Sequence, residues 1–269
     1  MISLDWVERI KADTLDFFER KLPNKDFDID IIYNAYPERI DNKVPQSVIT
    51  LVGKTLASKM AKCAEDYFEF FDYILQKKGD NGKIIFAYIM GRAVRKKPEK
   101  FLNYLQKILF EIDDQRECNL IIDKAIFPLL KKKPHQYLDL MMNWIKQDNK
   151  YLSLSIQKLL VKLISFEPDM IKPIFHKLET SWLYASPNMI KLNSNFLKST
   201  YKIDPDFYFS VFENYHSTRN PIFAEILCGA VCCYNKNIEK LLNLWAASGN
   251  IKLKKVGSHG LKILKKKGN

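Results

Sequence analysis

One short phrase is written twice in the chain, as Lys96–Leu102 (KKPEKFL) and as Lys132–Leu138 (KKPHQYL). Weaker copies of the phrase surround Pro168 and Pro205, so four prolines recur at intervals of 36, 34 and 37 residues. Proline suits the first turn of a helix and disfavours helix in the residue before it. A period in this range is typical of stacked helical repeats.

Each phrase predicts a first helix, and a polar break some 14 or 15 residues later predicts a second one. Breaks of this kind stand at residues 113–115, 148–149, 220–221 and 249–250. Trp144 and Asn149 match Trp245 and Asn250 at a shift of 101 residues, which supports the repeat. We expect both tryptophans to anchor their helices in the core rather than to bind a ligand. The prediction is an all-α fold, an α-solenoid of about six HEAT-like helix pairs preceded by an N-terminal helix.

The expected domains are residues 1–44, an N-terminal helix with a wrapping connection, and residues 45–269, a single HEAT-like repeat domain. The first helix is expected over 3–22, and residues 78–82 are expected to form a turn between two helices. A kink is expected at Pro128, inside a helix over 118–131. The predicted pairs are 64–78 with 83–96, 99–111 with 118–131, 136–146 with 151–165, 169–182 with 188–202, 206–216 with 221–234, and 236–247 with 252–267.

Composition restricts the class of protein. Hydrophobic residues make up 47% of 269 residues, as in a folded chain. The longest apolar run, 84–90, is too short to span a bilayer, and the N-terminus does not resemble a signal peptide. We therefore expect no membrane association and a cytoplasmic protein, or a nuclear one in a eukaryote. The five cysteines are an odd number without regular spacing, which indicates reduced thiols.

No cofactor and no metal site is predicted. Cys228 and Cys232 share a helix face, but His216 lies across a turn, so buried structural cysteines are the preferred interpretation over zinc. The net charge of +12 is uneven, with −3 in residues 1–82 and +15 in residues 83–269. An excess of this sign indicates an anionic partner, although any single lysine can equally belong to a solvated helix face.

Polar faces of the predicted second helices supply candidate binding residues. The helix over 151–165 presents Tyr151, Ser155, Lys158 and Lys162 opposite its leucines. Equivalent helices line one wall of a repeat stack, so we expect a basic stripe for phosphates there. The other candidates, on the preceding and following repeats, are Asn119, Asp123, Lys191, Asn195, Lys198 and Lys202.

The layout over about residues 55–205 resembles the HEAT-like DNA alkylation repair glycosylases of the AlkD type. The resemblance is carried by the helix at Pro98, the run Cys118–Asp123, the run Trp144–Leu152 and the run Asn195–Lys198 that leads to Asp204-Pro205. It implies a basic concave face that grips duplex DNA and a pocket of aromatic and arginine residues around an alkylated nucleotide. It also implies that Asp123 is the catalytic carboxylate.

The expected pocket departs from that pattern. Asn119 stands where the family has tryptophan, and Tyr151–Leu154 (YLSL) replaces a Trp-Leu-Arg-Arg run. Asn195 replaces the second tryptophan, and Lys198 keeps only the charge of its arginine. Aromatic faces hold a cationic base by cation–π attraction. We therefore expect weak or no glycosylase activity.

Three functions remain open from the sequence. The first is binding of duplex DNA, or another nucleic acid, without strong catalysis. The second is a protein–protein scaffold, in which the aromatic residues Tyr151, Tyr184 and Tyr215 anchor a partner. The third is an active glycosylase that uses Asp123 and is ranked last.

Overall fold

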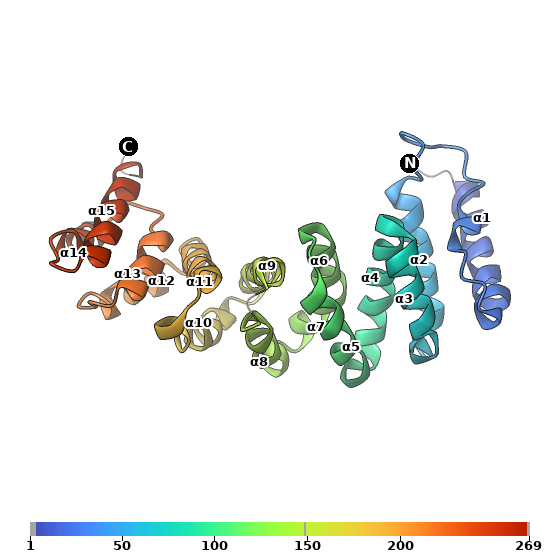
Figure 1. The fold of residues 1–269 in the computed structure, drawn as a ribbon, viewed down its shortest axis with the longest axis horizontal. Coiled ribbons are helices and arrows are strands. Elements are labelled where there is room, and N and C mark those ends of the chain that lie inside the picture. The colour runs from blue at the N-terminus through green and yellow to red at the C-terminus, as the bar shows by residue number, and fades with distance from the viewer. Residues whose placement is uncertain (1–3, 148, 268–269) are drawn as a thin grey trace. The chain divides into compact units, whose positions relative to one another are not determined.

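The computed structural model describes residues 4–147 and 149–267, and all regular elements in these ranges are helices (Figure 1). The predicted all-α class is thereby confirmed. The chain divides into two compact units, Met1–Lys132 and Lys133–Asn269. The predicted solenoid over residues 45–269 and its boundary at residue 45 stay predictions.

The first unit centres on α4, which packs against helices before and after it in the chain. Helices α2 and α6 contact its two sides, and α3 and α5 also lie against it. The elements are α1 (Leu4–Asp16), η1 (Phe17–Lys21), η2 (Leu22–Asn24), η3 (Ile29–Ile32), α2 (Gln46–Met60), η4 (Ala64–Tyr67), α3 (Phe68–Lys77), α4 (Gly79–Lys96), α5 (Pro98–Glu111), α6 (Gln115–Ile121), η5 (Ile122–Ile126) and α7 (Phe127–Lys132).

Two expectations for the first unit need correction. The N-terminal helix passes at Phe17 into a π-helical turn and then a 3₁₀ turn that ends at Asn24; Ser3, its expected start, lies outside the described residues. The break expected over residues 78–82 is a single residue, Lys78, because α4 already begins at Gly79. Gly79 has a φ of +50°, a left-handed conformation that glycine adopts without strain, so the chain reverses there abruptly.

The irregularity expected at Pro128 lies further upstream. Residues Ile122–Ile126 form the π-helical segment η5 between α6 and α7. Gly91 of α4 packs directly on this segment, and a Cβ atom at Gly91 would stand 2.4 Å from the Lys124 carbonyl oxygen. Proline at 128 cannot donate to the Lys124 carbonyl four residues earlier, as a regular helix requires. The widened turn and the glycine contact therefore occur at the same carbonyl.

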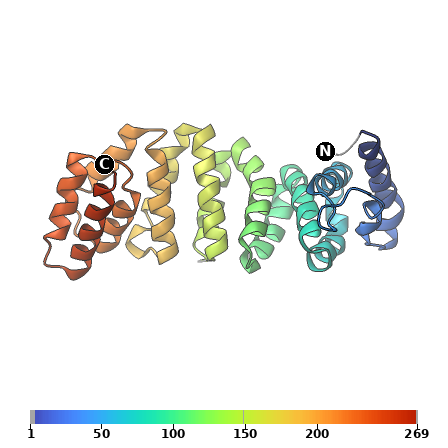
Figure 2. The same cartoon turned by 90° about the horizontal axis from the view of Figure 1, so that it is seen from above.

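The second unit consists of helix pairs that follow one another along the chain. In Figure 2 its helices run side by side, in colours from yellow-green to red. The elements are α8 (Pro134–Ile145), α9 (Lys150–Phe166), η6 (Pro168–Met170), α10 (Ile171–Glu179), η7 (Trp182–Tyr184), α11 (Pro187–Thr200), α12 (Pro205–Asn214), α13 (Pro221–Ala230), α14 (Lys236–Ala246) and α15 (Ile251–Lys265).

The second helix of each pair in this unit contacts the second helix of the next pair. Helix α9 packs on α11, α11 packs on α13, and α13 packs on α15. We call these four helices the B layer, and the first helices α8, α10, α12 and α14 the A layer. Within the pairs, α8 contacts α9, α10 contacts α11, and α14 contacts α15.

The repeated prolines and the polar breaks stand at the starts of helices, as expected. Pro98, Pro134, Pro168 and Pro205 each stand in the first turn of a helix. The polar breaks supply side-chain caps, which accept hydrogen bonds from the first free N–H groups of the following helix. The capping residues are Asp114 before α6, Asn149 before α9, Asn220 before α13 and Asn250 before α15. Asp148, which precedes Asn149 in the break at 148–149, lies outside the described residues.

The tryptophans anchor the second unit, as expected. Trp144 and Trp245 are buried, and the Nε1 atom of Trp245 donates to the Thr218 carbonyl at 3.1 Å. Trp182 is also buried and donates to Asn193 Oδ1 at 3.0 Å. The helix expected over 221–234 is shorter, since α13 ends at Ala230.

Candidate functional site

The predicted lysines lie on exposed faces of two adjacent B-layer helices. Lys158 and Lys162 stand on α9, and Lys191 and Lys198 stand on α11; Lys202 lies two residues beyond the end of α11. All five are exposed. The structure therefore brings candidates from two predicted repeats onto neighbouring helices of one layer.

Side chains between these lysines connect the two helices. Asn195 Nδ2 of α11 donates to Gln157 Oε1 of α9 at 3.1 Å. Tyr151, in the first turn of α9, is half-buried, with the Lys150 ammonium 5.9 Å from its ring centre. Ser155, expected on the polar face, is buried instead and belongs to the core side of α9.

Charge is segregated between the two layers of the second unit. Helices α9, α11 and α15 carry ten lysines and no acidic residue, and α13 adds only Glu225. The A-layer helices carry five acidic residues and four lysines. Lys177 of α10 pairs with Asp139 of α8 at 2.5 Å, and both helices belong to the A layer. The B layer is thus the cationic face of this unit.

Asp123, the catalytic candidate, lies in the first unit, within η5. Its Oδ2 atom accepts from Lys124 Nζ at 2.9 Å, and this hydrogen bond raises the pKa of Lys124. The Lys124 ammonium lies 5.7 Å from the centre of the Tyr88 ring. Asn119, one turn earlier on α6, accepts from Gln115 Nε2 at 3.2 Å. Asp123 thus forms an ion pair with its neighbour in sequence.

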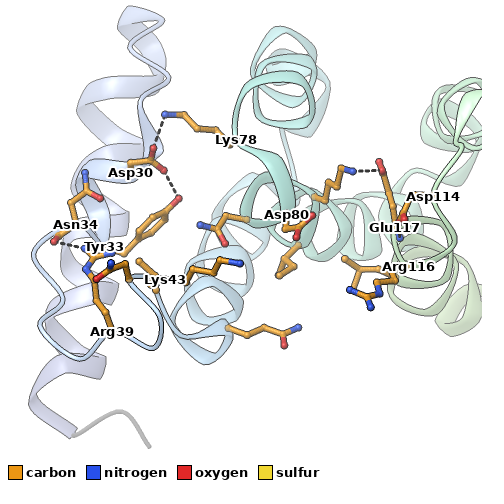
Figure 3. A pocket seen from close by; sticks show the side chains of 17 residues that line it. Asp30, Tyr33, Asn34, Arg39, Lys43, Lys78, Asp80, Asp114, Arg116 and Glu117 are labelled. Atoms are coloured by element: carbon orange, nitrogen blue, oxygen red, sulfur yellow. Dashed lines mark hydrogen bonds and ion pairs between the residues drawn. The ribbon is translucent and has the colours of Figure 1, made fainter.

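A polar cavity of about 990 Å³ in the first unit was not foreseen from the sequence (Figure 3). Its walls come from the connection between α1 and α2, from the start of α4 and from the start of α6. Its labelled lining residues in Figure 3 are Asp30, Tyr33, Asn34, Arg39, Lys43, Lys78, Asp80, Asp114, Arg116 and Glu117. The sequence signal for this cavity is the concentration of charged residues in the α1–α2 connection and in the first turns of α4 and α6.

Lys78 organises one wall of this cavity. Its ammonium donates to Asp28 and, at 2.9 Å, to Asp30, and the Tyr33 hydroxyl donates to Asp30 Oδ1 at 2.5 Å. Burial of Lys78 acts against its charge, but the hydrogen bonds to the two aspartates outweigh burial and raise the pKa of Lys78. Lys78 therefore remains a fixed cation that ties the α1–α2 connection to the start of α4.

A second cavity, of about 800 Å³, lies in the second unit between α12 and α14. Phe209, Phe212, Leu241 and Leu244 supply apolar lining, and Leu244 is 42% exposed. Tyr184, one of the aromatic residues expected to anchor a protein partner, is 87% exposed. Tyr215 is half-buried; its hydroxyl donates to Glu179, and its ring centre lies 5.0 Å from that of Trp182.

The cysteines are free thiols over the described part of the chain. Burial raises the pKa of Cys228 to about 12, and its Sγ atom lies 3.6 Å from the Val256 carbonyl oxygen. Residues 4–147 and 149–267 contain no group of three His, Cys, Asp or Glu side chains placed to hold a metal ion. In the same ranges, no helix is long and apolar enough to cross a bilayer.

When the chain is compared with known proteins, no family model, no curated protein and no solved structure matches it.

Proposed function

We propose that this chain is a nucleic-acid-binding protein of HEAT-like helix pairs, related to the DNA alkylation repair glycosylases, whose B layer holds a phosphate backbone. The proposal rests on the charge segregation in the second unit. Of the four B-layer helices, α9, α11 and α15 carry ten lysines and no acidic residue, and α13 carries one glutamate. Clustered cations on one face favour a polyanion, because each contact with a phosphate releases condensed counterions.

The kind of cation fits backbone binding rather than reading of base sequence. The B-layer helices carry lysine and no arginine. Lysine contacts phosphate as a point charge, whereas the planar guanidinium of arginine is the side chain suited to bidentate recognition. We therefore propose sequence-independent binding of duplex DNA, with RNA as the other nucleic acid to be compared.

Weak or absent base excision is part of the same proposal. Asp123 is paired with Lys124, and asparagines stand at positions 119 and 195 where the resemblance requires tryptophans. Without tryptophans at these two positions, the site lacks the cation–π attraction that the resemblance implies for an alkylated base.

Binding of a labelled duplex to the full chain, measured by fluorescence anisotropy at several salt concentrations, tests the proposal. Contacts to several phosphates predict that the logarithm of the affinity falls steeply with the logarithm of salt, by roughly 0.9 per contact. Absence of binding at low salt, or an affinity that salt leaves unchanged, contradicts it. Single- and double-stranded DNA and RNA in parallel identify the preferred nucleic acid.

A protein–protein scaffold is the second candidate function, and the cavity between α12 and α14 favours it. Phe209 and the exposed Leu244 offer apolar surface on the A layer, away from the lysines of the B layer. Aromatic and aliphatic side chains in such a cavity are typical anchors for a partner. Recovery of a stoichiometric protein by the wild-type chain but not by Leu244→Asp would support this function; recovery of nucleic acid alone would oppose it.

A further inference from the structure

An aromatic side chain stands almost fully exposed in the turn between α10 and α11. Tyr184 is 87% exposed, the highest value among the large hydrophobic residues that the structure describes, and its neighbour Leu183 is 49% exposed. Nearly all of the ring surface is therefore available to a partner, to which tyrosine presents an apolar face and a polar hydroxyl. The support and the surroundings of the ring indicate what this partner is.

The turn that carries Tyr184 is held by hydrogen bonds on both sides of the ring. Trp182, two residues earlier, is buried and donates to Asn193. The Tyr184 backbone N–H donates to the Ser181 carbonyl at 3.2 Å, and the Ser186 side chain, two residues later, caps α11. A ring on such a preordered support loses little conformational freedom when it binds. Tyr184 is thus suited to make a contact at a fixed position.

The turns that precede the B-layer helices lie along one edge of the second unit. The ring centre of Trp182, before α11, is 5.5 Å from that of Phe223 in the first turn of α13. Trp245, at the end of α14, donates to Thr218 in the turn before α13. Short turns reverse the direction of successive helices, so the B-layer helices, which Figure 2 shows among the helices side by side, run in the same direction. We call residues 149–151, 180–186, 215–220 and 247–252 the turn edge.

Cations accompany the exposed ring along the turn edge. The exposed cations of this edge are Lys150, Arg219 and Lys252. Lys191 is exposed near the start of α11, which carries no acidic residue. Two carboxylates at the ends of α10 and α12, Glu179 and Glu213, belong to the A layer, and Glu179 accepts from Tyr215. Cations that follow a backbone, with an aromatic ring on which bases stack, are the combination that binds single strands.

Stacking requires a base with a free face. In an intact duplex, neighbouring base pairs cover both faces of each base, and the grooves expose only base edges. Unpaired bases in loops, bulges and ends can turn outward and stack on an aromatic side chain. Every base has such a face, so the contact is independent of sequence, like the backbone binding proposed for the B layer. The exposed ring therefore fits a base that is not paired.

We propose that Tyr184 stacks on an unpaired base of a nucleic acid whose backbone lies along the B layer. The preferred ligand is then a nucleic acid with unpaired nucleotides within or beside a duplex, rather than a fully paired duplex. This inference rests on the proposed function and adds to it the kind of nucleic acid. A protein partner anchored on Tyr184 is the competing assignment, and the positive charge around the ring favours the nucleic acid.

Two labelled DNA duplexes of equal length and equal phosphate count test the inference, by fluorescence anisotropy with the full chain. One duplex is fully paired, and the other has a central run of mismatched bases. The wild-type chain should bind the mismatched duplex about tenfold more tightly, and Tyr184→Ala should remove this difference. Tyr184→Phe keeps the ring and should bind as the wild type does. The affinity for the paired duplex should be the same in all three chains, because it depends on the lysines.

Tyr234→Ala is the matched control. It removes a tyrosine that is 49% exposed in the connection between α13 and α14, outside the turn edge, and should leave both affinities unchanged. Thermal unfolding shows whether each variant is folded. Loss of the preference for the mismatched duplex in both alanine variants would mean that position 184 is not special, and would overturn the inference.

The same titrations separate this inference from the proposed function. Equal binding of the two duplexes by the wild-type chain, or a preference for the mismatched duplex that survives in Tyr184→Ala, overturns the stacking contact and leaves backbone binding in place. Absence of binding to both duplexes overturns the proposed function, and the stacking contact with it.

Discussion

Asn195 of α11 donates a hydrogen bond of 3.1 Å to Gln157 of α9, and lysines stand on both sides of this contact. Lys158 follows Gln157 directly, and Lys198 lies three residues, close to one helical turn, after Asn195. The hydrogen bond therefore holds cations from two different helices near one point of the B layer. A phosphate backbone that crosses this point would meet charges at positions fixed by helix packing rather than by flexible loops.

Reversing the charge of these lysines should remove duplex binding. The triple variant Lys158→Glu, Lys162→Glu, Lys198→Glu is expected to lose binding, because each lysine that contacts a phosphate contributes roughly 0.9 to the salt dependence. Anisotropy titrations over a salt series measure both quantities. The matched control reverses three exposed A-layer lysines, Lys172, Lys236 and Lys240, and gives the same change in net charge. Equal loss in both triple variants would mean that only net charge matters.

Base excision should not depend on Asp123. The Asp123→Asn variant removes the carboxylate charge beside Lys124 while keeping the size of the side chain. We expect release of alkylated bases from N-alkylated duplex to be equally low in the wild-type and variant chains, measured by chromatography of the released bases. Clear release by the wild-type chain that Asp123→Asn abolishes would restore a catalytic function for this residue.

Gly91→Ala should destabilise the first unit. The added Cβ atom would stand 2.4 Å from the Lys124 carbonyl oxygen, so α4 and η5 must move apart. Overpacking of this kind typically costs about 1–3 kcal/mol in the free energy of unfolding, measured with urea. Gly249→Ala is the control, because a Cβ atom there meets nothing within 4 Å. Equal stability of the Gly91→Ala and wild-type chains would show that the two helices are not held at this distance.

The cap of α15 should contribute measurable stability. Asn250 Oδ1 accepts from the backbone N–H groups of Lys252 and Leu253 at 3.0 and 3.2 Å. Asn250→Ala leaves both N–H groups without this acceptor and should cost about 1 kcal/mol in the free energy of unfolding. Asn250→Asp keeps the acceptor and adds a negative charge at a helix N-terminus, so it should be at least as stable as the wild type. A destabilised Asp variant would contradict capping as the cause.

The ion pair of Glu65 with Lys97 should make stability depend on pH in the acid range. The hydrogen bond from Lys97 lowers the pKa of Glu65 from its ordinary value of 4.5 to about 2. A lowered pKa stabilises the fold fully above pH 4.5, and this contribution is lost as pH falls from there through about 2. The Tm difference between the wild-type and Lys97→Met chains should therefore shrink over that interval. Lys107→Met, an exposed position on α5, is the control and should give a Tm difference that stays constant with pH.

Much of the fold is predictable because its signals are local. A proline or a capping asparagine acts within its own helical turn, so the starts of α5, α8, α12 and α15 follow from a few residues each. The π-helical segment η5 combines a local signal, Pro128, with a distant one, since its Lys124 carbonyl packs against Gly91, 33 residues earlier in the chain. Periodicity within one helix contains no information about such a contact.

The candidate sites also differ in how far local sequence predicts them. Exposed lysines on α9 and α11 follow from helical spacing, because the opposite faces are rich in leucine. The cavity of the first unit does not, since its lining residues Arg39, Lys78 and Arg116 come from the α1–α2 connection, the residue before α4 and the first turn of α6, which are far apart in the chain. Ser155 shows the limit of polarity as a guide, because helical spacing and residue type place it on the polar face of α9, whereas its side chain is buried.

The capping residues also bear on how this chain tolerates changes of length. Each cap sets the start of its own helix through hydrogen bonds that span only two or three residues. An insertion in a preceding turn would therefore leave the apolar face of the next helix in register. Intervals of 36, 34 and 37 residues between the repeated prolines are the variation expected of a chain whose helices begin anew at each boundary. Insertions and deletions should accumulate in these turns and be excluded from the helices themselves.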